Sequence, residues 1–321
     1  MIGTPTCSRR DFFKQGAVWS GGAAILGMAP MTLSAGEKPG PRQNHGNFID
    51  AHVHIWTNDF GKYPLAEGFT PKQMKPAVYL SEDILRHARP SGVNRIVLVQ
   101  MSYYGFDNSY MLDVIRQSPQ IFQGIAVVDW KSSNPDVKMR ELAEQGVRGF
   151  RIYADGVPPA AWLDGEGVEK MFRCGAKERV ALCLLINPDA LQAVDRKCEK
   201  FPDTPVIVDH MARIGMAGPI RDFDIKALCA LSRHSQVKVK VSGFYGLGEK
   251  KPPHLDLVPL IRRLYEAFGP KRLMWASDCP FQAIGETYED SISLVRDRLD
   301  FVTAEDKEWM LRRTAEESFF Q

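Results

Sequence analysis

The sequence predicts an α/β fold, a single (β/α)8 (TIM) barrel, and two observations support that prediction. Eight short apolar segments rich in Val, Ile and Leu begin at intervals of 25 to 47 residues. Such segments are typical of strands buried on both faces, and helical patterns lie between them. Repeated strand–helix units indicate a parallel sheet, and eight units within about 250 residues fit a closed barrel. The absence of a glycine-rich phosphate motif after any segment weakens a doubly wound, nucleotide-binding alternative.

The eight segments define the expected strands in chain order. Helix signals separate them: Ser81 is a candidate N-cap, and Pro135 and Pro188 occupy plausible first positions of helices. Gly146 and Gly269 stand where helix ends favour a left-handed residue. The expected strands cover residues 48–54, 95–100, 122–128, 147–152, 180–186, 205–209, 237–242 and 273–277.

Composition and charge exclude several classes of protein. The 321 residues are 44% hydrophobic and 25% charged, which is ordinary for a globular chain and excludes a disordered, collagen-like or polytopic membrane protein. The formal net charge of +2 comes without a dense basic stretch, so we expect no nucleic-acid partner. Six irregularly spaced cysteines indicate neither a disulfide scaffold nor a paired CxxC zinc site.

The first 35 residues have the pattern of a secretory signal peptide. Arg9 and Arg10 stand just before Phe-Phe-Lys, and an uncharged stretch follows at 16–35. The arginine pair resembles a twin-arginine signal, and the glycines of the stretch would make a poor membrane-spanning helix. We expect cleavage near Ala35, export to the periplasm by the twin-arginine machinery, and no stable membrane insertion afterwards. A retained anchor or a plain helix is the alternative.

The remaining chain divides into a linker at 36–46, rich in Pro, Gly and charge, and the barrel at 47–321. The leader carries three of the 41 basic and one of the 39 acidic residues, so 38 of each remain and the net charge falls to zero. Cys7 leaves with the leader. Because twin-arginine export carries proteins that folded in the reducing cytoplasm, we expect the other cysteines to be core thiols.

The first strand–helix connection is the longest, and its extra residues lie at about 57–80. Aromatic residues are frequent in and beside it, among them Trp56, Tyr63, Phe69 and Tyr79. In a barrel this connection lies at the mouth where active sites form, so we interpret it as a lid. A surface loop whose aromatic side chains pack on a neighbouring helix is the alternative.

Polar residues end three of the expected strands. His52 and His54 end the first strand and face the same side, His210 ends the sixth, and Asp278 follows the eighth. In a barrel these positions converge on one cavity, where two imidazoles can bind a divalent ion or orient a carbonyl oxygen. Hydrogen-bonded core histidines and an aspartate that caps a helix are the alternative.

These residues belong to motifs that resemble a known family. Asp-x-His-x-His-x-Trp begins at Asp50, Val-x-Asp-His ends at His210, and Ser-Asp-x-Pro begins at Ser277. Together they resemble the amidohydrolase superfamily, and within it the amidohydrolase-related branch that includes 2-pyrone-4,6-dicarboxylate lactonase and sugar-acid lactonases. Gly-x-Asp-Asn from Gly105 and the segment that ends at Arg151 also fit that branch. The resemblance implies a barrel hydrolase, of the lactonase type, that acts on a small organic acid or its lactone.

The resemblance leaves the question of a metal open. Metal-dependent relatives usually carry His or a modified Lys at the end of the fifth strand, whereas residues 182–187 contain neither, and Asn187 is better placed to cap a helix. His52, His54 and Asp278 remain as a three-ligand set for zinc or manganese, with water as the fourth ligand. Some lactonases of the branch are thought to work without a metal, so a metal-independent site is equally expected.

The residue types suggest a mechanism. We expect His52 and His54 to stabilise the oxyanion that forms when water attacks a lactone or ester carbonyl. Asp278 would be the general base, and His210 would bind the same oxygen or orient the water. No GxSxG motif is present in the sequence, which argues against an acyl-enzyme.

Substrate recognition leaves several alternatives. Arg151 is expected either to clamp a substrate carboxylate or to pair with Asp155 or another acid at the rim. Tyr103 and Tyr104 are candidate substrate-binding residues, and packing under the lid is their alternative. His254 is expected to be an exposed loop residue. Two other functions stay open, a metal-dependent decarboxylase of the same branch and a barrel that binds an organic acid without turnover.

Overall fold

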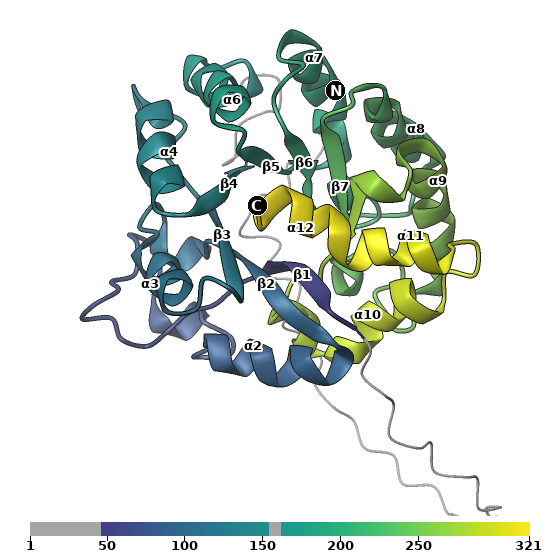
Figure 1. Cartoon of the computed structure of the whole chain (residues 1–321), viewed down its shortest axis with the longest axis horizontal. Coiled ribbons are helices and arrows are strands. Elements are labelled where there is room, and N and C mark those ends of the chain that lie inside the picture. The colour runs from purple at the N-terminus through teal and green to yellow at the C-terminus, as the bar shows by residue number, and fades with distance from the viewer. Residues whose placement is uncertain (1–45, 154–161) are drawn as a thin grey trace, which may run out of the picture.

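The computed structural model describes residues 46–153 and 162–321, and these form a barrel of eight parallel strands in chain order (Figure 1). The fold predicted from the sequence is confirmed, and every strand overlaps its predicted segment. The expected signal peptide and nearly all of the linker lie outside the described residues. The strands are β1 Phe48–Val53, β2 Val93–Val99, β3 Phe122–Ala126, β4 Val147–Tyr153, β5 Ala181–Leu185, β6 Val206–Val208, β7 Val237–Val241 and β8 Leu273–Trp275.

Helices cover the outside of the barrel, and the sequence signals for several of their ends are confirmed. Pro135 is the first residue of α4, and Gly269 ends α9 with a φ of 69°. The Asp83 carboxylate accepts the Leu80 N–H, so α2 is capped one residue earlier than Ser81. The helices are α2 Ser81–Ala88, α3 Ser109–Gln117, α4 Pro135–Glu144, α6 Glu166–Glu178, α7 Leu191–Lys200, α8 Asp222–Ala230, α9 Val258–Phe268, α10 Tyr288–Asp297, α11 Ala304–Glu308 and α12 Thr314–Phe319.

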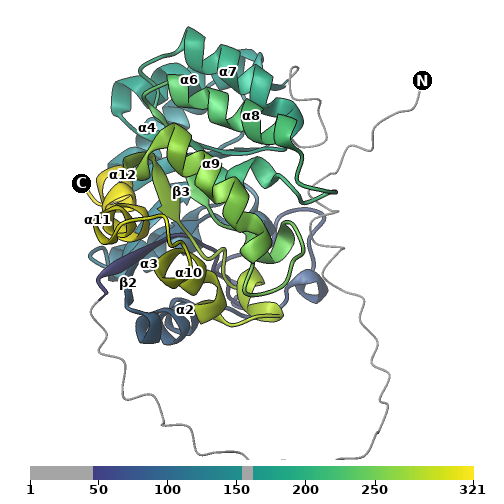
Figure 2. The ribbon, with the colours of Figure 1, turned by 90° about the vertical axis from the view of Figure 1, so that its right-hand side faces the viewer.

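The C-terminal helix closes one end of the barrel. Figure 1 shows α12 across the ring of strands, and Ala315 and Phe319 pack against interior residues such as Ile49 and Ala51. Figure 2 shows α11 and α12 at this end and the purple segment 57–80 at the other. Since α12 covers the end where the strands begin, the open mouth lies where the strands end, as in other barrels of this type.

The barrel closes between β8 and β1 through a short seam. Within the described residues no ladder joins these two strands; a single bridge pairs Val53 of β1 with Cys279, which follows β8. The backbone N–H of His54 donates to the Cys279 carbonyl (2.8 Å), and that of Asp278 donates to the His52 carbonyl (2.9 Å). The seam therefore places Asp278 directly beside the two histidines that end β1.

A buried carboxylate reinforces the seam. Asp50 Oδ1 accepts hydrogen bonds from the backbone N–H groups of Ser277 (2.9 Å) and His52 (3.1 Å), and Oδ2 accepts one from the Tyr288 hydroxyl (2.8 Å). Burial raises the pKa of Asp50 to about 6, although these donors oppose the shift. Asp50 thus joins β1, the end of β8 and α10 where ladder hydrogen bonds are missing.

The segment at 57–80 lies over the mouth and is tied down on several sides. The backbone N–H of Trp56 donates to the Tyr79 carbonyl, and the N–H of Tyr79 donates to the Trp56 carbonyl. The Trp56 ring packs against Tyr103, from the loop after β2, and against Phe281, from the loop after β8. The Tyr63 hydroxyl donates to Asp113 on α3 (2.6 Å). Its position at the mouth is as predicted, its aromatic residues pack on the neighbouring loops, and its action as a lid stays a prediction.

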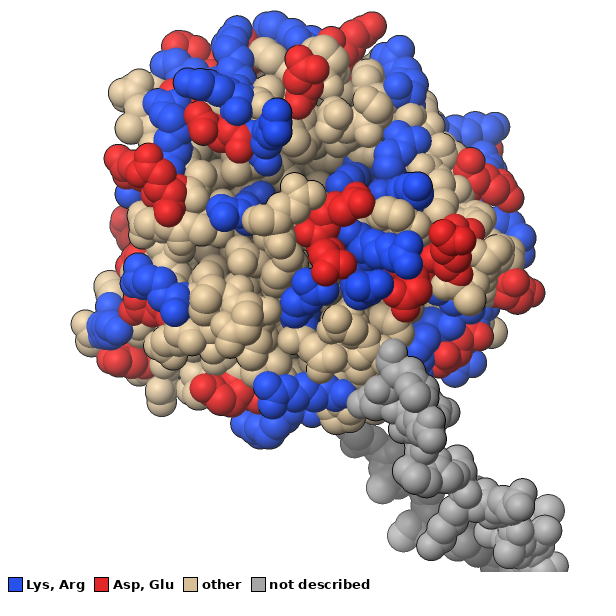
Figure 3. Space-filling view, in the orientation of Figure 1, with Lys and Arg blue, Asp and Glu red and all other residues tan. Residues whose placement is uncertain are grey.

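The surface and the thiols agree with an ordinary globular protein. Lys and Arg side chains are interspersed with Asp and Glu on the face seen in Figure 3. The five cysteines of the described residues are free thiols, and all but Cys229 are buried. None of the described helices combines the length and hydropathy needed to cross a membrane.

The seam yields a stability prediction. We expect Asp50→Ala to lower the free energy of unfolding by about 2–4 kcal/mol, because it leaves the Ser277 N–H buried without an acceptor. Asp50→Asn keeps one carbonyl oxygen for both N–H groups and can donate to Tyr288, so it should cost less than about 1 kcal/mol. Chemical denaturation of both variants measures the difference; equal losses would contradict the role given to Asp50.

Candidate active site

Strand β1 delivers two imidazoles to the barrel mouth. His52 and His54 are both buried, and their Nε2 atoms lie 3.2 Å apart. His54 Nδ1 lies 2.8 Å from the Val99 carbonyl, which can only accept, so Nδ1 carries the proton and Nε2 has a free lone pair. Burial lowers the pKa of both imidazoles, and for His52 the nearby Lys240 and Arg151 lower it further. Burial therefore favours the neutral form of both imidazoles, and the nearby Asp278 opposes this effect.

Asp278 stands at the centre of the site. The residue follows β8 in a left-handed conformation (φ 64°), which turns its carboxylate towards the histidines. Oδ1 lies 3.4 Å from His52 Nε2 and 3.5 Å from His54 Nε2, and Oδ2 accepts the Tyr245 hydroxyl (2.7 Å). Burial alone would raise the pKa of Asp278, but His210, His52 and His54 outweigh it and hold the pKa well below its ordinary value. Asp278 is therefore an anion.

His210 reaches the site from a strained turn after β6. The residues His210, Met211 and Ala212 have φ values of 52°, 51° and 53°, a run that L-residues rarely adopt and that is typical of functional sites. A Cβ at Gly243, whose φ is 73°, would lie 3.2 Å from the His210 ring, so glycine permits the approach. His210 Nδ1 lies 2.9 Å from the Ser242 hydroxyl, and burial lowers the pKa of His210 to about 4.

A buried charge network lies beneath the histidines. Asp209 Oδ2 lies 3.2 Å from Arg151 Nη2, and Asp209 Oδ1 lies 3.1 Å from Lys240 Nζ. Burial would raise the pKa of Asp209, but the two cations hold it well below its ordinary value. Arg151 Nη2 also lies 3.3 Å from His52 Nε2 and 3.5 Å from His210 Nε2. Two carboxylates, Asp209 and Asp278, thus lie beside two cations and three buried imidazoles.

Arg151 pairs with Asp209, a buried acid beneath the histidines and not at the rim. Asp155 lies outside the described residues, and the contact of Arg151 with a substrate carboxylate stays a prediction. The Tyr103 hydroxyl donates to the Gln73 carbonyl (3.0 Å). The Tyr104 hydroxyl accepts the Thr57 N–H (2.9 Å). Both tyrosines therefore pack beneath the segment 57–80, and their contact with substrate stays a prediction.

The exposure expected for His254 is wrong. Its side chain is buried, and Nε2 lies 2.8 Å from Glu286 Oε2. The loop after β7 turns back against the loop after β8, which brings the two residues together in the interior. The burial of His254 depends on the contact between these two loops. The Pro-rich sequence around His254 therefore gave no indication of it.

Three residues of the site were not predicted from the sequence. Lys240 belongs to the Val-Lys-Val-Lys-Val run of β7, where period-two alternation places both lysines on the barrel interior; that alternation was the available signal. Asp209 is part of the Val-x-Asp-His motif, but the motif alone assigned no function to it. Tyr245 follows β7 by a few residues, and nothing in the sequence distinguishes it from other loop tyrosines.

The site fits a divalent cation. The Nε2 atoms of His52 and His54 and Oδ1 of Asp278 are 3.2, 3.4 and 3.5 Å apart, and the edges of a tetrahedral zinc site are about 3.3 Å long. All three residues are buried, and among the described residues Asp278 Oδ1 has no hydrogen-bond donor. The cations Arg151 and Lys240 next to His52 oppose a second positive charge, so geometry and charge act in opposite directions.

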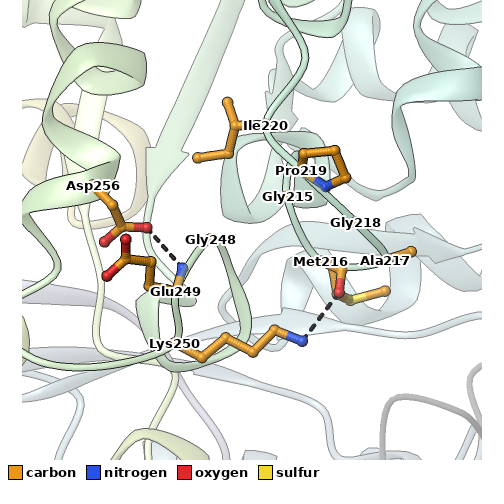
Figure 4. A pocket seen from close by; sticks show the side chains of 10 residues that line it. All are labelled: Gly215, Met216, Ala217, Gly218, Pro219, Ile220, Gly248, Glu249, Lys250 and Asp256. Atoms are coloured by element: carbon orange, nitrogen blue, oxygen red, sulfur yellow. Dashed lines mark hydrogen bonds between the residues drawn. The ribbon is translucent and has the colours of Figure 1, made fainter.

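A separate hollow of about 580 Å³ lies at the rim (Figure 4). It lies between the loop after β6, at 215–220, and the loop after β7, and it is distinct from the histidine cluster. Lys250 Nζ donates to the Met216 carbonyl (3.1 Å), and Asp256 accepts the Glu249 N–H (2.8 Å). The first bond joins the two loops, and the second lies within the loop after β7, on the same end of the barrel as the site.

Comparisons with known proteins agree with this geometry. A family model described as amidohydrolase matches residues 49–321. The chain is 27% identical to an L-fucono-1,5-lactonase of Burkholderia ambifaria, over 75% of this chain and 83% of that protein. It is 28% identical to a 4-sulfomuconolactone hydrolase of Rhizobium radiobacter, over 72% and 75%. A crystal structure of a Burkholderia multivorans amidohydrolase with bound zinc has the same fold, with a TM-score of 0.70 and 21% identity, covering 85% of this chain and 99% of that one.

The charge network yields a second stability prediction. Asp209→Asn removes the carboxylate between two buried cations and should lower the free energy of unfolding by about 3–5 kcal/mol. Asp195 is the matched control: it pairs with Arg233 and His234 at a partly exposed site, so Asp195→Asn should cost less than about 1 kcal/mol. Denaturant unfolding of both variants tests this, and a small loss for Asp209→Asn would mean that the network is not a coupled unit.

Proposed function

The chain belongs to the amidohydrolase family, and from that premise we propose that it is a lactonase, which adds water to the carbonyl of a small organic acid's lactone or ester. The main support is the position of the Asp278 carboxylate, which lies between three buried histidines at the mouth of the barrel. The similarity to an L-fucono-1,5-lactonase and a 4-sulfomuconolactone hydrolase supports a lactone as the substrate class.

Asp278 is the general base of the proposed reaction. The Tyr245 hydroxyl occupies Oδ2, while Oδ1 has no donor among the described residues and is free to take a proton from water. The hydroxide attacks the carbonyl carbon, and the ring C–O bond then breaks. Asp278 returns the proton to the leaving oxygen, so the carboxylate is regenerated at the end of each turnover.

The oxyanion would form beside the histidines and Arg151. His52 and His210 present their Nε2 atoms within 3.5 Å of the Arg151 guanidinium, so a carbonyl oxygen placed there meets imidazoles and a fixed positive charge. Such preorganised groups stabilise a developing negative charge at little reorganisation cost. Arg151 also remains our candidate for a substrate carboxylate, with its Nε and Nη2 anchored by Asp209.

His52, His54 and Asp278 would hold a zinc or manganese ion if one is bound. Such an ion would polarise the carbonyl and lower the pKa of a bound water. The zinc in the Burkholderia multivorans relative supports this assignment. Because Oδ1 of Asp278 would then be a ligand, its role as the base belongs to the metal-free site, whereas the roles of His210 and Arg151 are the same with or without an ion.

We expect hydrolysis of at least one lactone to survive treatment with a chelator, because Asp278 and the buried cations supply the base and the positive charge. The measurement is the rate on a panel of sugar-acid lactones, muconolactones and aromatic carboxylates, before and after chelation. Release of CO2 that requires restored metal would replace the lactonase by a decarboxylase. Tight binding of an organic acid without any turnover would make the chain a binding protein.

Asp278→Asn tests the proposed base. The amide cannot accept the proton of water, so we expect kcat on the lactone to fall by roughly 10²- to 10⁴-fold with thermal stability retained. Glu249→Gln is the matched control, since Glu249 is an exposed acid at the same end of the barrel and should leave kcat unchanged. Near-normal turnover by Asp278→Asn would exclude Asp278 as the base.

We also propose that the protein is exported to the periplasm by the twin-arginine route. The support is the sequence alone, with Arg9 and Arg10 ahead of an uncharged stretch. Replacement of both by lysine should leave the full-length chain in the cytoplasm, whereas the natural leader should give a shorter chain in the periplasmic fraction. Equal fractionation of both forms would contradict this route.

A further inference from the structure

His254 and Glu286 form a buried pair to which the proposed reaction gives no task. The His254 side chain is inaccessible to solvent, the Glu286 side chain is 6% exposed, and His254 Nε2 lies 2.8 Å from Glu286 Oε2. A carboxylate only accepts, so Nε2 carries the proton and donates it. The Gln282 amide donates to the same carboxylate oxygen. Burying these polar groups is costly, so their contact calls for an explanation.

The pair joins the two loops that hold the proposed base. His254 belongs to the loop after β7, and Glu286 belongs to the loop after β8. The first loop carries Tyr245, whose hydroxyl donates to Asp278 Oδ2 (2.7 Å), and the second loop carries Asp278 itself. The hydrogen bond between His254 and Glu286 therefore ties the base and its donor to one another at a second point.

The position of His254 is passed on to the turn that carries Tyr245. The His254 backbone is left-handed (φ 58°), a conformation that a residue with a side chain keeps only where its surroundings determine it. The His254 ring packs against the buried ring of Phe244, with 5.8 Å between the centroids. Phe244 begins the short turn Phe244–Gly246, of which Tyr245 is the middle residue. A shift of His254 would therefore move this turn.

The other partner, Glu286, is fixed next to the seam of the barrel. Tyr288 follows it by two residues and donates to Asp50 (2.8 Å), the carboxylate that binds N–H groups on both sides of the seam. The same seam holds the backbone of Asp278. The hydrogen bond from the loop after β7 to Glu286 thus refers the position of that loop to the element that places the base.

We propose that His254 and Glu286 are positioning residues that keep the Tyr245 hydroxyl on Oδ2 of Asp278, so that Oδ1 stays turned towards the histidines. The inference deepens the proposed function, and its kinetic consequence rests on Asp278 as the base. Its geometric consequence does not depend on the reaction. His254 and Glu286 act through Tyr245 and touch no reacting atom.

The first test is structural and needs no substrate. Crystal structures of Glu286→Ala and Glu286→Gln give the distance from the Tyr245 hydroxyl to Asp278 Oδ2. We expect it to exceed about 3.5 Å in Glu286→Ala, because His254 loses its acceptor. It should stay near 2.7 Å in Glu286→Gln, whose amide oxygen still accepts. An unchanged distance in Glu286→Ala would overturn the proposal.

Two further variants complete this test. His254→Phe keeps an aromatic ring against Phe244 and removes only the donor, so it gives the same comparison if Glu286→Ala does not fold. Lys250→Met is the matched control, because it cuts a different tie of the same loop, the hydrogen bond to the Met216 carbonyl. We expect a lengthened distance in His254→Phe and an unchanged one in Lys250→Met. The opposite pattern would overturn the proposal.

The second test is kinetic. His254→Phe should lower kcat on the lactone roughly 10-fold with little change in KM, because the base is misplaced while the substrate contacts remain. Tyr245→Phe should lower kcat at least as much, and the double variant should be no slower than Tyr245→Phe alone, since His254 acts only through Tyr245. Additive losses, the result expected of a purely structural role, would overturn the proposal. If the chain hydrolyses no lactone, the proposed function fails, and the measured distance alone decides this inference.

Discussion

The contact between the first and last strands is the constraint on which the site depends. β8 and β1 share one backbone bridge and a few hydrogen bonds, with Asp50 bound to both sides of the seam. Asp278 lies 3.4 Å from His52 Nε2 because the Asp278 N–H pairs with the His52 carbonyl across this seam. Residues more than 200 positions apart thus become one cluster through barrel closure, and the chemistry follows from the topology.

Charge compensation is the second requirement, because the cluster is buried. Burial alone would leave Asp278 protonated and unable to act as a base, but the histidines around it keep it ionised. Asp209 keeps Arg151 and Lys240 in place close to His52, where their charge favours a neutral imidazole and an anionic transition state. The same two cations oppose a further positive charge beside His52, although the three candidate ligand atoms have tetrahedral spacing.

The sequence was sufficient for the barrel and for the principal residues. Apolar segments with turn residues at their ends predicted every strand, and the ends of β1, β6 and β8 predicted His52, His54, His210 and Asp278 as one cluster. The rest depended on contacts between strands. Asp209 and Lys240 are ordinary charged residues in the sequence, and they become a network only when β6 and β7 are neighbours in the barrel. The burial of His254 likewise results from the packing of two loops.

In the proposed reaction water attacks the lactone directly, and Asp278 acts as base and not as nucleophile. A single turnover of excess enzyme with its lactone in H2 18O, followed by mass spectrometry of product and protein, tests it most directly. Direct attack by water predicts one 18O atom in the new carboxylate after the first turnover and unlabelled Asp278. An unlabelled product from that turnover, with 18O in the peptide that contains Asp278, would show a covalent intermediate and contradict the account.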